Sequence, residues 1–131
     1  MVMTTQKMEC NPVGWFEIPV TDMNRAKAFY EAVLKYSIKI QDNEDGSMGW
    51  FPMSETGYGA SGALVHGKGY IPSLGGMLIY FSETDIDAAL DRVRKSGGNV
   101  IKEKTDIGEY GFYAWVEDTE GNRIGLHSMP Q

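Results

Sequence analysis

The chain has 131 residues, of which 42% are hydrophobic and 23% charged, and its formal net charge is −6. That length suits one compact domain, or two small halves that share a core. A single cysteine excludes a disulfide scaffold, and no apolar run reaches the roughly 18–20 residues of a membrane span. The acidic balance argues against nucleic acid as a partner. The N-terminus lacks the basic start and apolar core of a signal peptide, so a cytoplasmic protein is expected.

The first half of the chain predicts a strand, a helix and three further strands. Residues 1–11 carry no pattern and are expected to form a flexible tail. Residues 15–20 alternate in chemistry like a strand, and Asp22 follows as a helix N-cap. One apolar helical face is then formed by Ala26, Phe29, Tyr30, Val33 and Leu34. Turn signals separate the strands expected at about 36–41, 47–53 and 60–66.

The second half repeats this order after a connector rich in glycine and proline at residues 67–76. A strand at 77–82 leads to Asp85 as the next N-cap, and glycines at 97–98 end the helix that follows. The apolar face of this helix consists of Ile86, Ala89, Leu90 and Val93. The remaining strands are expected at about 99–103, 111–117 and 122–128.

The two halves form an internal repeat with a period of 63 residues. Subtracting 63 places Asp85 on Asp22, Phe81 on Ile18 and Gly125 on Gly62. Each unit has the order βαβββ, with a helix on one face of its sheet and nothing on the other. The prediction is an α+β fold in which paired modules (about 13–66 and 77–129) form a curved mixed sheet with the helices on its outer face. Residues 12–131 are expected to be a single domain.

Strand alternation assigns side chains to the helix-covered face or to the open inner face. The residues predicted on the inner face are Trp15, Glu17, Gly62, Leu64, His66, Leu78, Tyr80, Arg123, Gly125 and His127. Polar and aromatic groups that converge on a concave surface are typical of a ligand site. The candidate ligand-binding residues are Trp15, His66, Leu78, Tyr80 and Arg123. The alternative is a partly solvated face on which Glu17 forms a structural ion pair with Arg123 or a histidine.

Several segments resemble the vicinal oxygen chelate superfamily. They are Thr21-Asp22 after the first strand, Arg25-Ala26-Lys27-Ala28-Phe29-Tyr30, Gly97-Gly98-Asn99-Val100 and Glu117-Asp118-Thr119-Glu120-Gly121-Asn122. The superfamily includes glyoxalase I, bleomycin-resistance proteins, extradiol dioxygenases and fosfomycin-resistance enzymes. The resemblance covers about residues 13–129. It implies paired βαβββ modules and a homodimer.

The resemblance also implies where a catalytic metal would be held, at one inward position on the first and fourth strands of each module. These positions carry Trp15 and Gly62 in the first module and Leu78 and Gly125 in the second. None of the four side chains can coordinate a divalent metal, so no cofactor is expected. This argues against glyoxalase I and extradiol dioxygenase chemistry. A shifted metal site through Glu17, His66 and His127 remains an open hypothesis.

Three functions therefore compete. The first is a protein that binds a small organic molecule in the inner groove, to which Trp15 and Tyr80 contribute aromatic walls. The second is a lyase or isomerase acting on a small carbonyl compound, with Glu17 as general base and His127 as its partner. The third is a subunit whose role is interaction with other proteins. The preferred hypothesis is the first, with a small molecule as partner and neither nucleic acid nor membrane.

Overall fold

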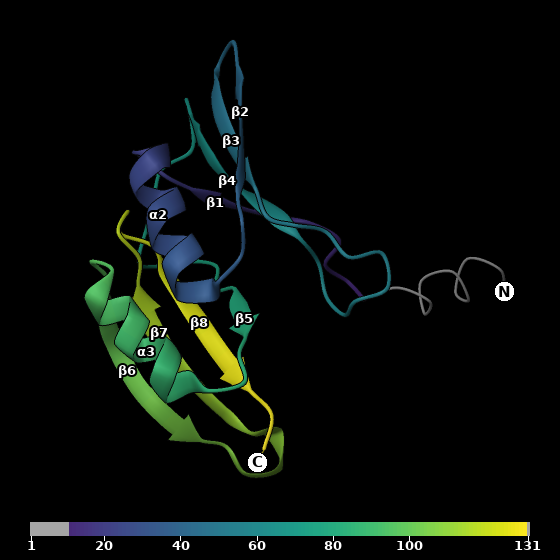
Figure 1. Cartoon of the computed structure of the whole chain (residues 1–131), viewed down its shortest axis with the longest axis vertical. Coiled ribbons are helices and arrows are strands. Elements are labelled where there is room, and N and C mark those ends of the chain that lie inside the picture. Colours follow the sequence, from purple (N-terminus) through teal and green to yellow (C-terminus); the bar gives the residue numbers. More distant parts are fainter. Residues whose placement is uncertain (1–10, 131) are drawn as a thin grey trace, which may run out of the picture.

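The computed structural model describes residues 11–130, so most of the tail expected at 1–11 lies outside the described residues. The first module contains β1 (Phe16–Pro19), α2 (Met23–Leu34), β2 (Lys39–Asn43), β3 (Gly46–Trp50) and β4 (Gly62–Gly67). The second contains β5 (Tyr80–Ser82), α3 (Ile86–Lys95), β6 (Asn99–Asp106), the short 3-10 helix η1 (Gly108–Tyr110), β7 (Phe112–Glu117) and β8 (Arg123–Ser128). The α+β class and the paired βαβββ modules are confirmed (Figure 1).

The eight strands form two four-stranded sheets, whereas the sequence predicted one shared sheet. Their orders are β1-β4-β3-β2 and β5-β8-β7-β6. In each module the first and last strands run parallel, and the remaining pairs are antiparallel. Pro19 is the last residue of β1, at an edge of its sheet, where its missing N–H costs no ladder bond.

Both helices begin at the aspartates predicted from the sequence. The Asp22 carboxylate accepts a hydrogen bond of 3.0 Å from the backbone N–H of Arg25, and Asp85 accepts one of 3.1 Å from Ala88. α2 ends at Lys35 in the left-handed conformation, with φ 63°, and Gly97 takes φ 92° just after α3. Neither α2 nor α3 has the length and apolar character needed to cross a membrane, nor does any other helix within residues 11–130.

The two modules share one hydrophobic core. α2 packs on β3 and β4, α3 packs on β6, β7 and β8, and the two helices contact each other. Between the helices, the Arg92 guanidinium donates from Nε to the Val33 carbonyl at 2.9 Å. Aromatic rings also meet across the boundary, since Phe16 and Phe81 lie edge to face with centroids 5.6 Å apart. The side of each sheet that a helix covers therefore faces the shared core around α2 and α3 (Figure 1).

A buried polar latch joins the turn between β7 and β8 to the start of α2. Glu120, whose side chain is 0% exposed, accepts from the backbone N–H groups of Thr21 and Asp22, each at 2.9 Å. It also forms an ion pair of 2.7 Å with Arg25. Burial alone would raise the pKa of Glu120, but the hydrogen bonds from Arg25, Asp22, Thr21 and Thr119 outweigh it and lower the pKa to about 2. The carboxylate is thus held charged at the module boundary.

A second buried contact reinforces the latch. The Tyr30 hydroxyl of α2 donates a hydrogen bond of 2.6 Å to Asp118, which is 88 residues away in sequence. Burial, followed by the charge of Asp118, raises the pKa of Tyr30 well above its usual value, so the phenol keeps its proton. Asn122 adds a bond of 2.7 Å from its side-chain amide to the Pro19 carbonyl. The turn from Asp118 to Asn122 therefore fixes the second module against β1 and α2.

Candidate ligand-binding site

The inner face of module 2 is arranged as the sequence predicted. Ile124 and Leu126 are buried beneath the helix layer, whereas Arg123, Gly125 and His127 alternate onto the opposite face of β8. The register places Tyr80 of β5 and Trp115 of β7 on either side of Gly125, and it places Tyr113 beside His127. Tyr80, Tyr113 and Trp115 form a continuous group of rings that we call the aromatic platform.

A glycine beneath the aromatic platform allows the rings to lie close to the sheet. A Cβ on Gly125 would come within 2.3 Å of the Tyr80 ring, so only glycine leaves room for the ring in this position. The Trp115 indole Nε1–H donates a hydrogen bond of 2.7 Å to the Tyr80 hydroxyl oxygen, which fixes the two rings relative to each other. The Tyr113 ring lies 6.4 Å from Tyr80 and 5.8 Å from Trp115, centroid to centroid.

Cationic side chains flank this platform. The Arg123 guanidinium lies 5.0 Å from the Trp115 ring centroid, and Lys102 Nζ lies 5.7 Å from the same ring and 5.8 Å from Tyr113. Lys102 faces Trp115 in the β6–β7 register, which puts it on the inner face. Lys102, Tyr113 and Trp115 were not among the residues predicted for the site from the sequence. Alternation along residues 111–117 could have assigned the two aromatic residues to this face.

His127 lies at the other end of the platform. Its Nε2 is 2.7 Å from the backbone carbonyl oxygen of Tyr110, so this nitrogen donates and Nδ1 is left as the acceptor in the neutral imidazole. A cavity of about 500 Å³ opens here, lined by Tyr80, Ser82, Ile107, Tyr113 and His127. The inner face of module 2 thus combines an aromatic floor, cations and a histidine.

The inner face of module 1 carries a smaller aromatic group. The Trp15 and Trp50 rings lie 5.2 Å apart at a tilt of 56°. Glu17 is exposed, and its carboxylate accepts hydrogen bonds of 3.0 Å from the Tyr70 hydroxyl and 3.4 Å from the Trp15 indole. Trp15 and Glu17 therefore face the side that the sequence predicted.

The prediction for β4 was wrong by one residue. Ile18 pairs with Leu64 in the parallel register, and both are buried in the core, so Leu64, Gly62 and His66 lie on the helix-covered face. Phe81, which lies 63 residues after Ile18, pairs with Leu126, only 62 residues after Leu64. The spacing between equivalent residues of the two modules is therefore one residue shorter at their last strands than at their first strands. His66 is exposed at the end of β4 and takes no part in the inner face.

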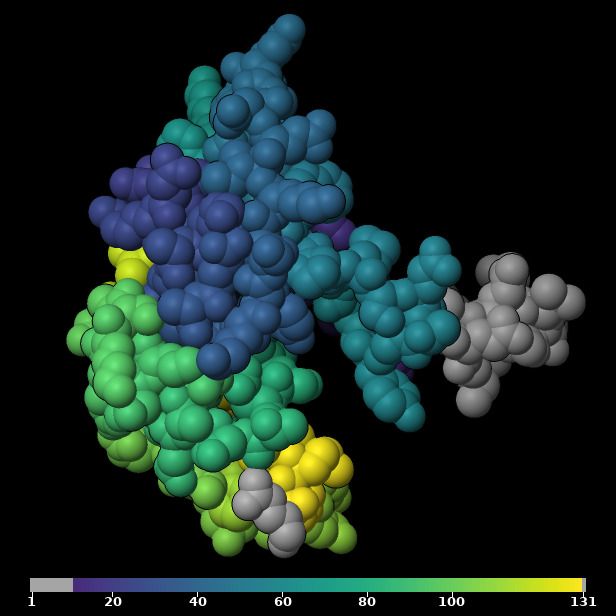
Figure 2. Space-filling view, in the orientation of Figure 1, coloured from purple at the N-terminus to yellow at the C-terminus, as the bar shows by residue number. Residues whose placement is uncertain are grey.

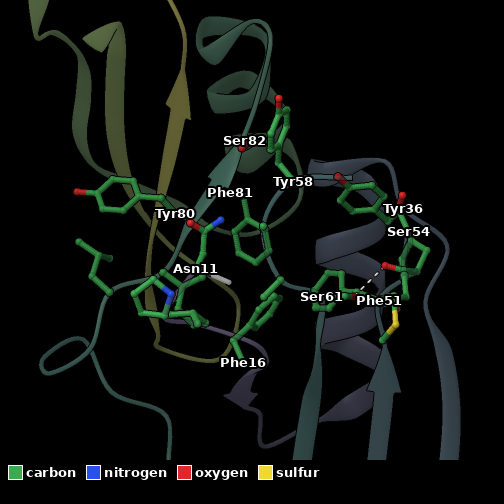
Figure 3. Close-up of a pocket in the computed structure, with 18 residues that line it drawn as sticks. Asn11, Phe16, Tyr36, Phe51, Ser54, Tyr58, Ser61, Tyr80, Phe81 and Ser82 are labelled. Atoms are coloured by element: carbon green, nitrogen blue, oxygen red, sulfur yellow. Dashed lines mark hydrogen bonds between the residues drawn. The ribbon is translucent and has the colours of Figure 1, made fainter. Parts of the chain in front are cut away.

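A larger cavity lies where the modules meet, and sequence reasoning missed it. This junction cavity has a volume of about 900 Å³, and Phe16, Phe51 and Phe81 form its floor (Figure 3). The loop between β3 and β4 contributes Tyr58 and Ser61 to its rim, and Ser61 donates to the Pro52 carbonyl at 2.8 Å. Figure 2 shows the molecule hollowed between this loop and the second module. Of the predicted ligand-binding residues, Leu78 and Tyr80 border this cavity.

Comparison with known proteins decides the family. The sequence model of the "Glyoxalase/Bleomycin resistance protein/Dioxygenase superfamily" matches residues 13–126, most of the chain. The chain belongs to this superfamily. Its fold is that of the vicinal oxygen chelate proteins, as the sequence resemblance indicated.

Individual members of the superfamily are moderately similar. The "Putative glyoxylase CFP32" of Mycobacterium tuberculosis is 29% identical over 118 residues, covering 86% of this chain and 44% of that protein. The chain therefore spans less than half the length of this curated relative. The crystal structure of TnmS3, an antibiotic binding protein from Streptomyces sp. CB03234, is 26% identical with a TM-score of 0.63, covering 92% of this chain and 97% of that chain. A glyoxalase/bleomycin resistance protein from the same organism is 27% identical with a TM-score of 0.65, covering 87% and 97%.

The residues at the superfamily's metal positions do not fit a metal ion. In the observed register the metal-ligand position on β4 falls on Ala63, because Ala63 is the β4 residue that corresponds to Gly125 of β8. Trp15, Ala63, Leu78 and Gly125 offer no coordinating side-chain atom. Over Gly125 the Tyr80 ring fills the space into which a ligating side chain would project. Within residues 11–130, no three His, Cys, Asp or Glu side chains come together in a group that could hold a metal.

The acid–base pair considered from the sequence is divided between the modules. Glu17 accepts hydrogen bonds from Trp15 of module 1 and from Tyr70 of the connector that follows it. His127 forms its hydrogen bond with Tyr110 of module 2. In the described part of the chain, no hydrogen bond or ion pair joins Glu17 to His127 or Arg123. Glu17 and His127 therefore bond to different partners within one chain, and their role as an acid–base pair stays a prediction.

Proposed function

We propose that this protein binds a small organic molecule with an aromatic ring on the inner face of module 2, and that it does so without a metal at the superfamily's usual positions. The observation that carries the proposal is the Tyr80 ring seated on Gly125. An aromatic surface occupies the place where a metal-dependent relative would project a ligating side chain. The chemistry of this surface favours stacking and hydrogen bonding over Lewis-acid catalysis.

A relative described as an antibiotic binding protein provides further support. This is TnmS3, whose 26% identity to this chain is spread over nearly the whole length of both. Sequestration of a flat molecule requires apolar rings, a few oriented polar groups and an accessible face. The aromatic platform, Arg123 and the cavity beside His127 supply all three.

We also propose that the protein is a cytoplasmic homodimer, as the sequence analysis expected. Large apolar side chains are exposed beside the junction cavity, on the connector and directly after it, including Met53, Tyr58, Ile71 and Met77. Exposed apolar surface of this kind is typical of a contact between protein chains. Light scattering coupled to size-exclusion chromatography should give twice the chain mass of 14.6 kDa.

Binding can be tested with three probes that share one ring system: 2-naphthalenemethanol, 2-naphthoate and 2-naphthylmethylammonium. Isothermal titration calorimetry should detect saturable binding of at least one of them. Trp115→Leu should weaken binding, because Trp115 belongs only to the inner face. Tyr58→Ser is the matched control, because Tyr58 borders the junction cavity and is fully exposed. Absence of binding by all three probes, or loss of binding in Tyr58→Ser alone, contradicts the proposal.

A further inference from the structure

Two cations lie against the aromatic platform without a partner of opposite charge. Arg123 and Lys102 both approach the Trp115 ring, at 5.0 Å and 5.7 Å. Most of the other basic side chains within residues 11–130 form an ion pair with a carboxylate. Examples are Arg25–Glu120, Arg92–Glu83 and Lys104–Asp87. Within residues 11–130, neither Arg123 nor Lys102 forms an ion pair. Their charges are available to a bound molecule.

The Arg123 side chain carries a specific unmet donor. Its Nε is buried and finds no hydrogen-bond acceptor in the described structure. Glu117 faces Arg123 in the β7–β8 register, but its carboxylate instead accepts a bond of 3.4 Å from the Asn99 side chain. A buried N–H without an acceptor is destabilising, so the chain itself does not compensate this guanidinium, and its terminal N–H groups are left as donors for a ligand.

The local charge is opposite in sign to that of the whole chain. The charged side chains that the register places on this face are Lys102, Arg123 and Glu117. The face therefore has a net positive charge, although the formal net charge of the chain is −6. The Nε2 atom of His127 is engaged with the Tyr110 carbonyl, which leaves Nδ1 as an additional acceptor at the edge.

We infer that the ligand class of this site is an aromatic anion: a planar ring bearing a carboxylate or an ionised phenol. The ring stacks on Trp115 and Tyr80, and the anionic oxygen accepts a charge-assisted hydrogen bond from the terminal N–H groups of the Arg123 guanidinium, with Lys102 contributing charge from the rim. This inference rests on the proposed function and adds the sign of the ligand's charge.

The test compares ligands that differ only in charge. We would measure the Kd of 2-naphthoate, of the neutral 2-naphthamide and of 2-naphthylmethylammonium by calorimetry, at low and at high salt. The expected order is naphthoate tightest, by about tenfold or more over the amide, because hydrogen bonds to charged groups are the stronger ones. The ammonium should bind more weakly than the amide. The preference for naphthoate should shrink as salt increases.

Variants identify the groups responsible. Arg123→Met should remove most of the preference of naphthoate over naphthamide, and Arg123→Lys should keep part of it, because the charge remains while the planar guanidinium donors are lost. Lys102→Met, at an exposed position, should reduce the preference without affecting folding. Arg94→Gln is the matched control, since Arg94 lies on α3, away from the platform, where it pairs with Glu103 of β6.

The outcomes separate this inference from the proposed function. Equal binding of naphthoate and naphthamide, or tighter binding of the ammonium, overturns the inference and leaves a ring-binding site standing. A preference for naphthoate that survives both Arg123→Met and Lys102→Met also overturns it. Absence of binding by these three probes and by 2-naphthalenemethanol overturns both claims.

Discussion

Trp115 and Tyr80 are joined by a hydrogen bond of 2.7 Å that crosses over β8, from the indole N–H on β7 to the hydroxyl oxygen on β5. Gly125 lies between them in the strand order, and its missing side chain allows the Tyr80 ring to rest on the backbone. Three neighbouring strands thus build one aromatic surface of mutually tilted rings, in a fold whose metal-dependent members use the same place for ligating side chains.

Gly125→Ala should disturb this surface. The added Cβ would lie 2.3 Å from Tyr80 Cδ1, so the ring must move, and we expect its hydrogen bond to Trp115 to be disturbed. The near-ultraviolet circular dichroism of the indole should change, and the free energy of unfolding should fall by about 1–3 kcal/mol. Gly14→Ala is the matched control, because a Cβ at Gly14 meets no atom within 4 Å. An unchanged spectrum in Gly125→Ala would show that the ring is not held as described.

Tyr30→Phe should weaken the junction between the modules. It removes the donor of the 2.6 Å bond to Asp118 and leaves a buried carboxylate with fewer partners. The free energy of unfolding measured by urea denaturation should fall by about 1–3 kcal/mol. Tyr36→Phe removes a hydroxyl from a side chain that is 46% exposed and should have little effect. Equal stabilities of the two variants would refute a role for the latch.

Acid should destabilise the protein through Glu120. The pKa of Glu120 is lowered from 4.5 to about 2 in the folded state, so the unfolded chain takes up this proton first as the pH falls. The stabilisation is complete above about pH 4.5 and is lost progressively towards pH 2, by an order of 2–3 kcal/mol. Wild type and Glu120→Gln should therefore differ most in unfolding free energy near neutral pH and converge near pH 2.

Glu103→Gln provides the control for this comparison. Glu103 pairs with Arg94 at the surface, where its side chain is 69% exposed, and such pairs contribute little to stability. Its pH dependence of unfolding should follow that of the wild type. A Glu120→Gln variant with the same pH dependence as the wild type would contradict the assignment.

The sequence was sufficient to predict the helices and strands, and to predict which side chains lie on the inner face of module 2. Asp22 and Asp85 mark both helix starts, because a carboxylate at the N-cap satisfies free backbone N–H groups wherever it occurs. Alternation placed Tyr80, Arg123 and His127 correctly. It failed on β4, because a shift of one residue in the repeat exchanges the two faces of a strand and moves His66 away from the site.

Other features were not accessible to local patterns. The floor of the junction cavity brings Phe16, Phe51 and Phe81 together from three separate elements, and a loop without periodicity forms its rim. The turn from Asp118 to Asn122 shows its role only in three dimensions, since Glu120 bonds to residues nearly one hundred positions earlier. The unpaired state of Arg123 likewise depends on Glu117 bonding to Asn99.

The central claim is that an aromatic surface binds the ligand in place of the superfamily's metal. The most direct measurement is the Kd of 2-naphthoate for protein dialysed against EDTA, compared with the same protein supplemented with zinc, nickel or manganese. The account predicts the same Kd in every sample. Binding that disappears after EDTA and returns with one of these metals would contradict it.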